Sequence, residues 1–259
     1  MKRLREGFVE TANPYNASQI KRVSLLPVTK GMKTENGVDV FVFWTRNPRH
    51  ILAHADELIN RGIPFYVMVS VTGYPNTLEP NMSPASEVLP VMRELARKIG
   101  EDRVIWRYDP ILLSNVTDED FHRRNFDSLA QGLAGSVRRV IISIYDEYKG
   151  AKQRLEELEE EGLFLLDTGG DLLPMLADLA KSAEAAGMEI QSCAEGEDYS
   201  PIGIKPGACV DAALIKKLCG LEFSGKDKNQ RSYCLCCKST DIGAYGTCDA
   251  KCVYCYAWR

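Results

Sequence analysis

Short apolar runs alternate with amphipathic stretches along most of the chain. The apolar runs have the length of β-strands and are almost continuously hydrophobic, which is typical of strands buried on both faces. The stretches between them carry apolar residues at helical spacing, and several end at glycine. The sequence predicts strands at 38–45, 65–71, 103–108, 139–145 and 188–193, a short last strand at 239–244, and helices at 51–61, 86–99, 117–133 and 171–186.

This order of elements indicates the fold class. Strands that alternate with helices of this length favour βαβ units and a parallel sheet. No Gly-x-Gly-x-x-Gly segment follows a predicted strand, and no Walker-type loop is present, which disfavours a dinucleotide fold or a phosphate-loop enzyme. We therefore predict an α/β fold of the partial (βα) barrel type. Residues 1–225 would form the barrel body, and residues 226–259 a cysteine-rich, cluster-binding segment packed on the barrel mouth.

Composition and charge narrow the class of protein. The chain has 259 residues, of which 45% are hydrophobic and 26% charged, and this excludes extensive disorder. The net charge of −4 provides no basic field for nucleic acid or an anionic membrane. The N-terminus carries no apolar run typical of a signal peptide, and the most apolar segment, 65–71, is too short to span a bilayer. We expect a cytoplasmic protein that contacts no membrane.

The cysteines change this ordinary picture. There are nine of them, and five lie between residues 236 and 255. In a reducing compartment, clustered cysteines indicate metal or redox chemistry more often than disulfides. Three residues separate Cys248 from Cys252, and two separate Cys252 from Cys255. Thiolates on one such loop can hold three corners of a cubane iron–sulfur cluster, whose usual ligand number is four, so that one iron stays open.

The spacing Cys248-x-x-x-Cys252-x-x-Cys255 resembles the motif of the radical S-adenosylmethionine superfamily, including an aromatic residue, Tyr254, before the third cysteine. In that superfamily the three cysteines hold a four-iron four-sulfur cluster, and the open iron binds S-adenosylmethionine. The resemblance implies reductive cleavage of S-adenosylmethionine to a 5′-deoxyadenosyl radical, with ferredoxin or flavodoxin as the reductant and Tyr254 near the adenine. The local Cys-x-Tyr-Cys-Tyr form is similar to spore photoproduct lyase-like proteins.

Nearly the whole chain also resembles a prokaryotic family of unknown function, the domain of unknown function 1848 family, with a cysteine-rich C-terminus. The resemblance is carried by residues 43–48, 106–110, 228–231 and the terminal cysteine block. In radical S-adenosylmethionine enzymes the motif usually follows the first barrel strand, whereas here it closes the chain. A circular permutation of a (βα)₆ barrel would reconcile the two orders. Compared with the family, the body is expected to lack an N-terminal strand and helix.

Structural zinc is the alternative to an iron–sulfur cluster. Cys234, Cys236 and Cys237, together with the motif cysteines, could supply a tetrahedral site. Against zinc, the three histidines, His50, His54 and His122, are far from these cysteines in sequence, and the motif itself has the spacing Cys-x-x-x-Cys-x-x-Cys. The ligand pattern therefore favours iron–sulfur over zinc.

Four other cysteines could form an auxiliary metal site. One ends the predicted strand at 188–193, one lies in a loop, and two precede the motif, so that three segments contribute ligands. Packing in the core, which is common for free cysteines, is the alternative. The four are Cys193, Cys209, Cys234 and Cys236. Cys219 is expected to pack within a helix, and Cys237 is left unassigned.

Polar side chains at strand ends supply the remaining candidates, because the active site of a (βα) barrel is built at the carboxyl ends of its strands. Arg107 and Asp109 share a face by alternation and could bind a ligand or form an internal ion pair. Glu195 is in phase with Cys193 and is a third catalytic candidate, whereas His122 is expected to cap or pack its helix. The candidates for cofactor binding, besides Tyr254, are Thr45, Asn47 and Ser143.

We therefore expect an iron–sulfur protein of the radical S-adenosylmethionine type that acts on an unidentified small or macromolecular substrate. The alternative is a non-enzymatic module, stabilised by zinc or an iron–sulfur cluster, for binding or electron transfer. Nucleic-acid repair rests on the lyase-like motif alone and finds no support in the charge balance.

Overall fold

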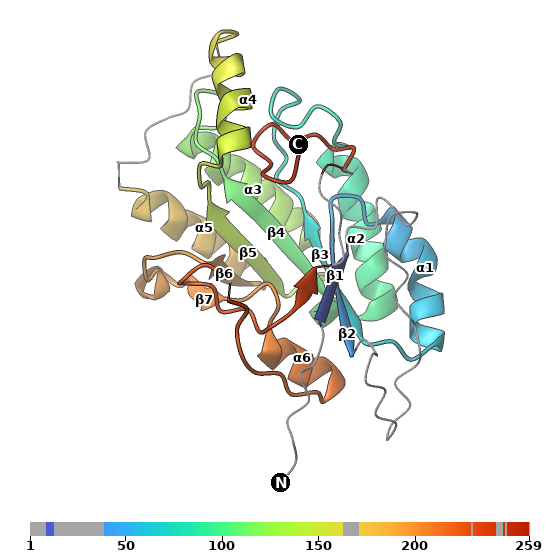
Figure 1. Cartoon of the computed structure of the whole chain (residues 1–259). Helices are drawn as coiled ribbons and strands as arrows, with labels where there is room; N and C mark the ends of the chain where they lie inside the picture. The colour runs from blue at the N-terminus through green and yellow to red at the C-terminus, as the bar shows by residue number, and fades with distance from the viewer. Residues whose placement is uncertain are drawn as a thin grey trace.

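One parallel sheet organises the chain. The computed structural model describes residues 39–162, 171–228, 230–241, 246 and 248–258, and the backbone of 9–12. Its eight strands follow the order β7-β6-β5-β4-β3-β2-β1-β8, and every neighbouring pair is parallel (Figure 1). The strands are β1 (Val9–Ala12), β2 (Val40–Thr45), β3 (Phe65–Ser70), β4 (Val104–Ile111), β5 (Arg139–Ile144), β6 (Glu189–Cys193), β7 (Lys205–Gly207) and β8 (Thr240–Asp241).

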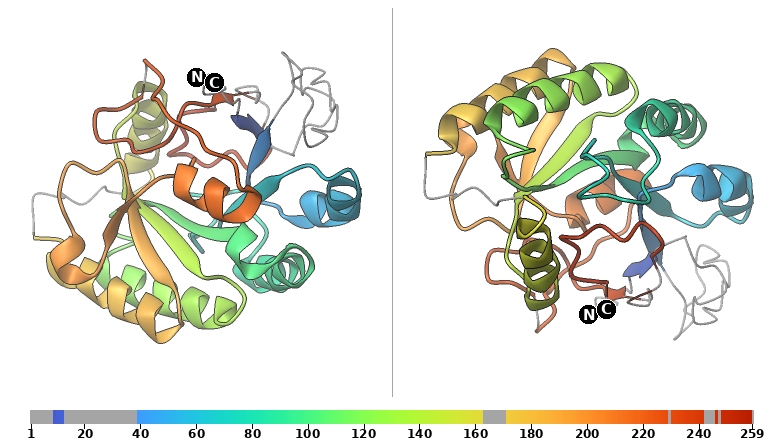
Figure 2. Two further views of the ribbon diagram at one scale, coloured as in Figure 1. Left: turned by 90° about the horizontal axis from the view of Figure 1, so that it is seen from below. Right: turned by 90° about the horizontal axis from the view of Figure 1, so that it is seen from above.

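Helices cover both faces of the sheet. The outer, convex face carries α1 (Arg49–Asn60), α2 (Ala85–Ile99), α3 (Glu119–Leu133) and α5 (Leu173–Ala185), and α6 (Ala212–Cys219) lies on the concave face (Figure 2). The remaining helix, α4 (Lys149–Glu159), stands beside the C-terminal segment at the carboxyl ends of the strands (Figure 1). Both faces are therefore buried, which accounts for the nearly continuous apolar strands.

Alternation along each strand separates two cores. On the outer face, Trp106 and Tyr108 are fully buried among the residues of α2, α3 and α5. On the inner face, Met68 and Ile105 pack against α6, with Leu214 among their neighbours. The predicted alternation, which places Arg107 and Asp109 on the face opposite Trp106 and Tyr108, is confirmed by the side chains that line the inner cavity described below.

Capping fixes where two of the helices begin. The Asp118 carboxylate accepts a hydrogen bond of 2.7 Å from the amide of Phe121 and starts α3. The Asp211 carboxylate accepts bonds from the amides of Ala213 and Leu214 and starts α6. The latter helix ends at Gly220, whose φ of 68° lies in the left-handed region that favours glycine.

The predicted elements are found, with differences at their ends. Strand β4 continues past the predicted end at residue 108 to Ile111. Strand β8 is found within the predicted last strand, of which residues 242–244 lie outside the described residues. Helix α6 was expected only through Cys219, which ends it, and strands β1 and β7 were not predicted from the sequence.

The α/β class and the parallel sheet are confirmed. In the described part of the chain the sheet is open, since its edge strands, β7 and β8, do not pair with one another. Barrel closure and circular permutation therefore stay predictions, although β8, which precedes the cysteine motif, lies beside β1. Within the described ranges, no helix combines the length and the apolar character needed to cross a membrane.

Candidate functional site

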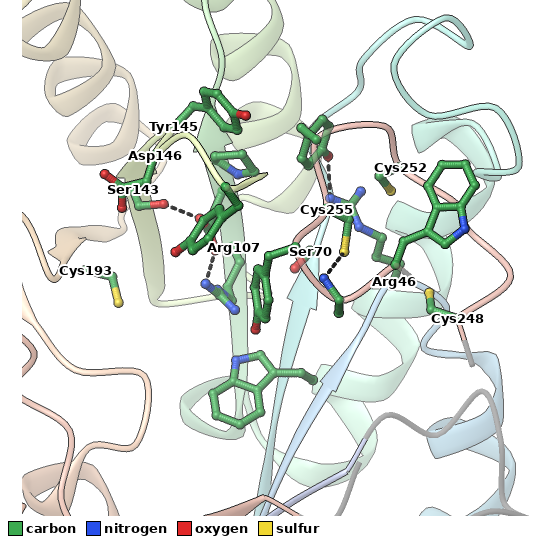
Figure 3. Close-up of a pocket in the computed structure, with 18 of the residues that line it drawn as sticks. Arg46, Ser70, Arg107, Ser143, Tyr145, Asp146, Cys193, Cys248, Cys252 and Cys255 are labelled. Carbon is green, nitrogen blue, oxygen red and sulfur yellow. Dashed lines mark hydrogen bonds and ion pairs between the residues drawn. The ribbon is translucent and has the colours of Figure 1, made fainter. Parts of the chain in front are cut away.

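A cavity of about 540 Å³ opens at the carboxyl ends of the strands, where ligands of α/β proteins usually bind. One wall consists of strand-end side chains from the inner face, and the other is the C-terminal segment. In Figure 3, Cys193 lies on one side, the three motif cysteines lie on the other, and Arg107 and Ser70 lie between them. The lining residues that matter here are Trp44, Ser70, Arg107, Asp109, Ser143, Cys193 and Cys209 on the strand side and Cys248, Cys252, Tyr254 and Cys255 on the other.

Arg107, Asp109 and Ser143 form the polar centre of the strand wall. Arg107 is ion-paired with the Asp109 carboxylate, which also accepts a hydrogen bond from Ser143 Oγ. The internal ion pair considered from the sequence is thus present, and it borders the cavity. Arg107 Nε and Trp44 Nε1 are buried and have no hydrogen-bond partner within the described part of the chain. Two donors therefore remain for a group bound in the cavity.

The cysteine motif is fixed to the body by Arg154 of α4. Its guanidinium donates to the carbonyl of Val253 at 2.9 Å and to that of Cys255, and it lies over the Trp258 ring with 4.6 Å to the centroid. The amide of Val253 donates in turn to the Leu78 carbonyl at 3.0 Å. The backbone that carries the last two motif cysteines is therefore bonded on both sides.

A buried network of hydrogen bonds around one ion pair also holds this segment in place. Arg46, just after β2, lies 2.7 Å from the Glu79 carboxylate and donates to the Tyr254 hydroxyl at 2.6 Å. Glu79 also accepts hydrogen bonds from Tyr254 and Thr72. Burial opposes the charge on Arg46, but Glu79 holds the pKa of the guanidinium above its ordinary value. The resemblance places Tyr254 near an adenine. In the structure its hydroxyl is hydrogen-bonded within this network, and the residue also lines the cavity.

The environment of the Cys252 thiol differs from that of free cysteine. Burial raises the pKa of Cys252 to about 11, although the neighbouring Arg46 acts in the opposite direction. In the absence of metal this thiol is therefore protonated at neutral pH. Metal binding would displace that proton, because cysteine binds metals as the thiolate.

The four cysteines expected at an auxiliary site are brought together. The Sγ atoms of Cys193 and Cys209 are 3.2 Å apart, and both residues line the cavity. Cys236 and Cys234 pack in the same inner cluster as these two residues, and Cys236 Sγ accepts a hydrogen bond of 3.2 Å from the amide of Val210, the residue after Cys209. Cys219 lies apart from this group at the end of α6.

Three other candidates serve the fold. Thr45 lines the cavity, but its hydroxyl bonds to the backbone carbonyl and amide of Asn47, and the Asn47 side chain accepts from the Arg49 amide at the start of α1. Glu195 is not a lining residue, since its carboxylate accepts from the amide of Ile144 at 2.9 Å. Thr45 and Asn47 form a turn because short polar side chains bond readily to nearby backbone. Glu195, in contrast, joins its segment to the end of β5.

His122 packs in the core, as expected. It is fully buried, its Nδ1 is 2.8 Å from the Tyr108 hydroxyl, and its Nε2 is 3.2 Å from the Leu112 carbonyl. Four residues of the site were not among the candidates predicted from the sequence: Arg46, Glu79, Arg154 and Trp44. For Trp44 and Arg46, the one available signal was their position at the carboxyl end of a predicted strand.

The donor set at the motif can be tested against the implied cluster. Three thiols on one segment, bordering a cavity large enough for a ligand, fit a cubane that leaves one iron open. A single tetrahedral ion needs ligands that converge on one point, and among the described residues no group of three or more His, Cys, Asp or Glu side chains does so. A cubane spreads its thiolates over separate irons. Binding of either group would therefore require the motif thiols to move toward it.

Comparison with known sequences gives a family for the whole chain. The family described as a domain of unknown function (DUF1848) matches residues 1–257. None of the curated proteins matches the chain.

Proposed function

Because the chain belongs to the DUF1848 family, whose description names no activity, we propose a function from the cavity itself. We propose an iron–sulfur protein of the radical S-adenosylmethionine type. The observation that carries this proposal is the position of Cys248, Cys252 and Cys255, all of which border one cavity at the carboxyl ends of the strands. A motif used only to stabilise the chain terminus would not need to face a cavity lined by polar strand ends.

The cavity has the size and chemistry for a cofactor and a substrate. Its volume of about 540 Å³ is within the range of small-molecule sites, about 300–1,000 Å³. Arg107 Nε and Trp44 Nε1 supply unused donors to a polar group of either molecule. Two of the arginines that line the cavity, Arg46 and Arg107, are already paired with carboxylates. At this part of the wall, recognition would depend on hydrogen bonds and shape.

The residues of the chain have distinct tasks in this proposal. Cys248, Cys252 and Cys255 would hold a four-iron four-sulfur cluster, and Arg46 with Tyr254 would keep their segment in position. The cluster, when bound, supplies the electron that splits S-adenosylmethionine into methionine and a 5′-deoxyadenosyl radical, with ferredoxin or flavodoxin as the electron source. Trp44 and Tyr254 would shield the cavity from water. The substrate class is not specified by these residues.

Electron paramagnetic resonance tests the proposal directly. The protein is reconstituted with iron and sulfide without oxygen, reduced with dithionite, and measured with and without S-adenosylmethionine. We expect a reduced-cluster signal that changes when S-adenosylmethionine is added, and release of 5′-deoxyadenosine on turnover. The Cys252→Ala variant should lose both. Cys219→Ala is the matched control, because Cys219 lies at the end of α6 and is not a lining residue.

The results also separate the alternative function. A cluster signal that S-adenosylmethionine does not change, together with a metal-dependent gain in thermal stability, would indicate a metal-stabilised binding or electron-transfer module. A protein that binds zinc alone at the motif would contradict the proposal. Equal behaviour of Cys252→Ala and the wild type would also contradict it.

A further inference from the structure

A second group of thiols gathers around Cys193, which lies across the cavity from the cysteine motif (Figure 3). Cys193 ends β6, Cys209 lies between β7 and α6, and Cys234 and Cys236 precede β8. The sulfur atoms of Cys193 and Cys209 are 3.2 Å apart, and Cys234 and Cys236 pack in the same cluster of inner-face residues. The sheet and the inner core thus bring sulfur atoms from three separate segments into one place.

The backbone and the charges around these thiols suit bound thiolates. The amide of Val210 donates to Cys236 Sγ at 3.2 Å, and the amide of Cys237 donates to the Val210 carbonyl at 3.0 Å, which holds the two segments side by side. Hydrogen bonds of this kind to a ligating atom orient and stabilise metal sites. Arg107 lines the cavity together with Cys193 and Cys209, which places a guanidinium on the same wall as these thiols.

Apolar packing alone explains the group poorly. Cys209 and Cys236 are buried, as core cysteines usually are. Cys193 and Cys234 are only partly buried, and Cys193 lies on the cavity wall. A core does not require four cysteines from three segments to pack together beside a polar cavity, whereas a thiolate-bound metal site does.

We infer that Cys193, Cys209, Cys234 and Cys236 hold a second, thiolate-bound metal centre that is separate from the cysteine motif. Four sulfur ligands select zinc or an iron–sulfur cluster, and both share this chemistry. Among the described residues no group of three or more His, Cys, Asp or Glu side chains converges on one point, so the four thiols would move together when the metal binds. Cys234, which is only partly buried, would complete the site by turning toward Cys209. The inference goes beyond the proposed function and does not depend on it.

Metal analysis of the full chain, purified without oxygen from cells supplied with iron and zinc, tests the inference. The variant Cys248→Ala/Cys252→Ala/Cys255→Ala removes the motif and leaves the second group intact. We expect it to retain about one metal centre per chain, detected as iron with acid-labile sulfide or as zinc without sulfide. Adding Cys193→Ala and Cys209→Ala should remove that metal. Complete loss of metal in the triple variant would overturn the inference, and so would metal retained in the fivefold variant.

Two controls protect this test from misfolding and from a general effect of cysteine loss. In the triple-variant background, Cys219→Ala and Cys237→Ala should leave the metal content unchanged. Thiol alkylation gives a second readout: the four thiols should resist iodoacetamide in the triple variant and react after a chelator is added. Thiols that react equally before and after chelation would contradict the inference. Because the motif is absent from these variants, the result is independent of any activity with S-adenosylmethionine.

Discussion

The guanidinium of Arg46 lies 2.6 Å, through Nη2, from the hydroxyl of Tyr254, which follows it by 208 residues. The same guanidinium lies 2.7 Å from Glu79, and the exposed fractions of the two charged side chains are 14% and 4%. One buried ion pair therefore joins the end of β2 to the segment that carries the motif. The ion pair therefore helps the sheet to fix the position of the motif cysteines.

Glu79→Gln should destabilise the protein strongly. The substitution leaves the Arg46 charge buried without its carboxylate, and breaking a buried pair in this way costs about 3–5 kcal/mol. The midpoint of thermal unfolding should fall by on the order of 10 °C in a chain of this size. Glu87→Gln is the matched control, since its pair with Arg49 has exposed fractions of 55% and 43% and should contribute less than about 1 kcal/mol. Equal losses of stability in the two variants would show that the buried ion pair contributes no more to stability than the exposed one.

Arg154→Lys should loosen the motif segment while the charge is kept. Lysine cannot reproduce the planar fork with which Arg154 contacts the carbonyls of Val253 and Cys255. We expect faster hydrogen exchange at the amides of residues 252–256, measured by mass spectrometry, and unchanged exchange in β3 and β4. Arg123→Lys serves as the control, because Arg123 makes its ion pairs with Glu119, Asp120 and Asp178. Identical hydrogen exchange in the two variants would show that Arg154 does not hold the motif segment in place.

His122 should make the protein less stable in acid. Burial lowers the pKa of this histidine from 6.5 to about 4. Between these values the unfolded chain binds a proton that the folded protein does not, so the free energy of unfolding decreases as the pH falls through this window. From pH 7 to pH 5 the loss should be about 2 kcal/mol.

Urea unfolding at the two pH values measures this effect. His122→Asn should reduce the pH dependence by the amount stated, even if the variant is less stable at both values. His54→Asn, at an exposed histidine, should keep the wild-type dependence. If His122→Asn kept the wild-type dependence of stability on pH, groups other than His122 would be responsible for the acid sensitivity.

The cysteines should differ in reactivity in the metal-free protein. Burial raises the pKa of Cys252 to about 11. The hydrogen bond from Cys209 lowers the pKa of Cys193, with Arg107 acting in the same direction. Because the thiolate is the reactive form, iodoacetamide at pH 7.5 should modify Cys193 well before Cys252. Peptide mass spectrometry gives the order, and labelling in denaturant, where the two rates should become similar, is the control.

The periodicity of the sequence predicts the sheet but not all of its parts. Long apolar strands and their helices follow from local pattern, and so does the placement of Arg107 opposite Trp106. Strand β7 contains Pro206 and Gly207, which ordinarily argue against a strand and are tolerated here at the edge of the sheet. Helix α6, of eight residues, is too short to give a clear period.

The candidate site shows a similar division. The thiols could be predicted because residue type and spacing alone restrict their chemistry. Glu79 could not, because a carboxylate between β3 and α2 has no local feature that marks it for burial against Arg46. Thr45 and Asn47 end a predicted strand, as Ser143 does, yet their bonds form a turn. Position at a strand end therefore predicts nearness to the cavity better than it predicts the task of a side chain.

The order of the strands has a consequence for biosynthesis. Strand β8 and the motif cysteines leave the ribosome after every other strand of the sheet, and domains generally fold from the N-terminal side during synthesis. The rest of the sheet can thus form before β8 is available to pair with β1. Under the proposed function, a cluster could be loaded at the motif only after residues 248–255 have been synthesised, so its loading would follow the folding of the body.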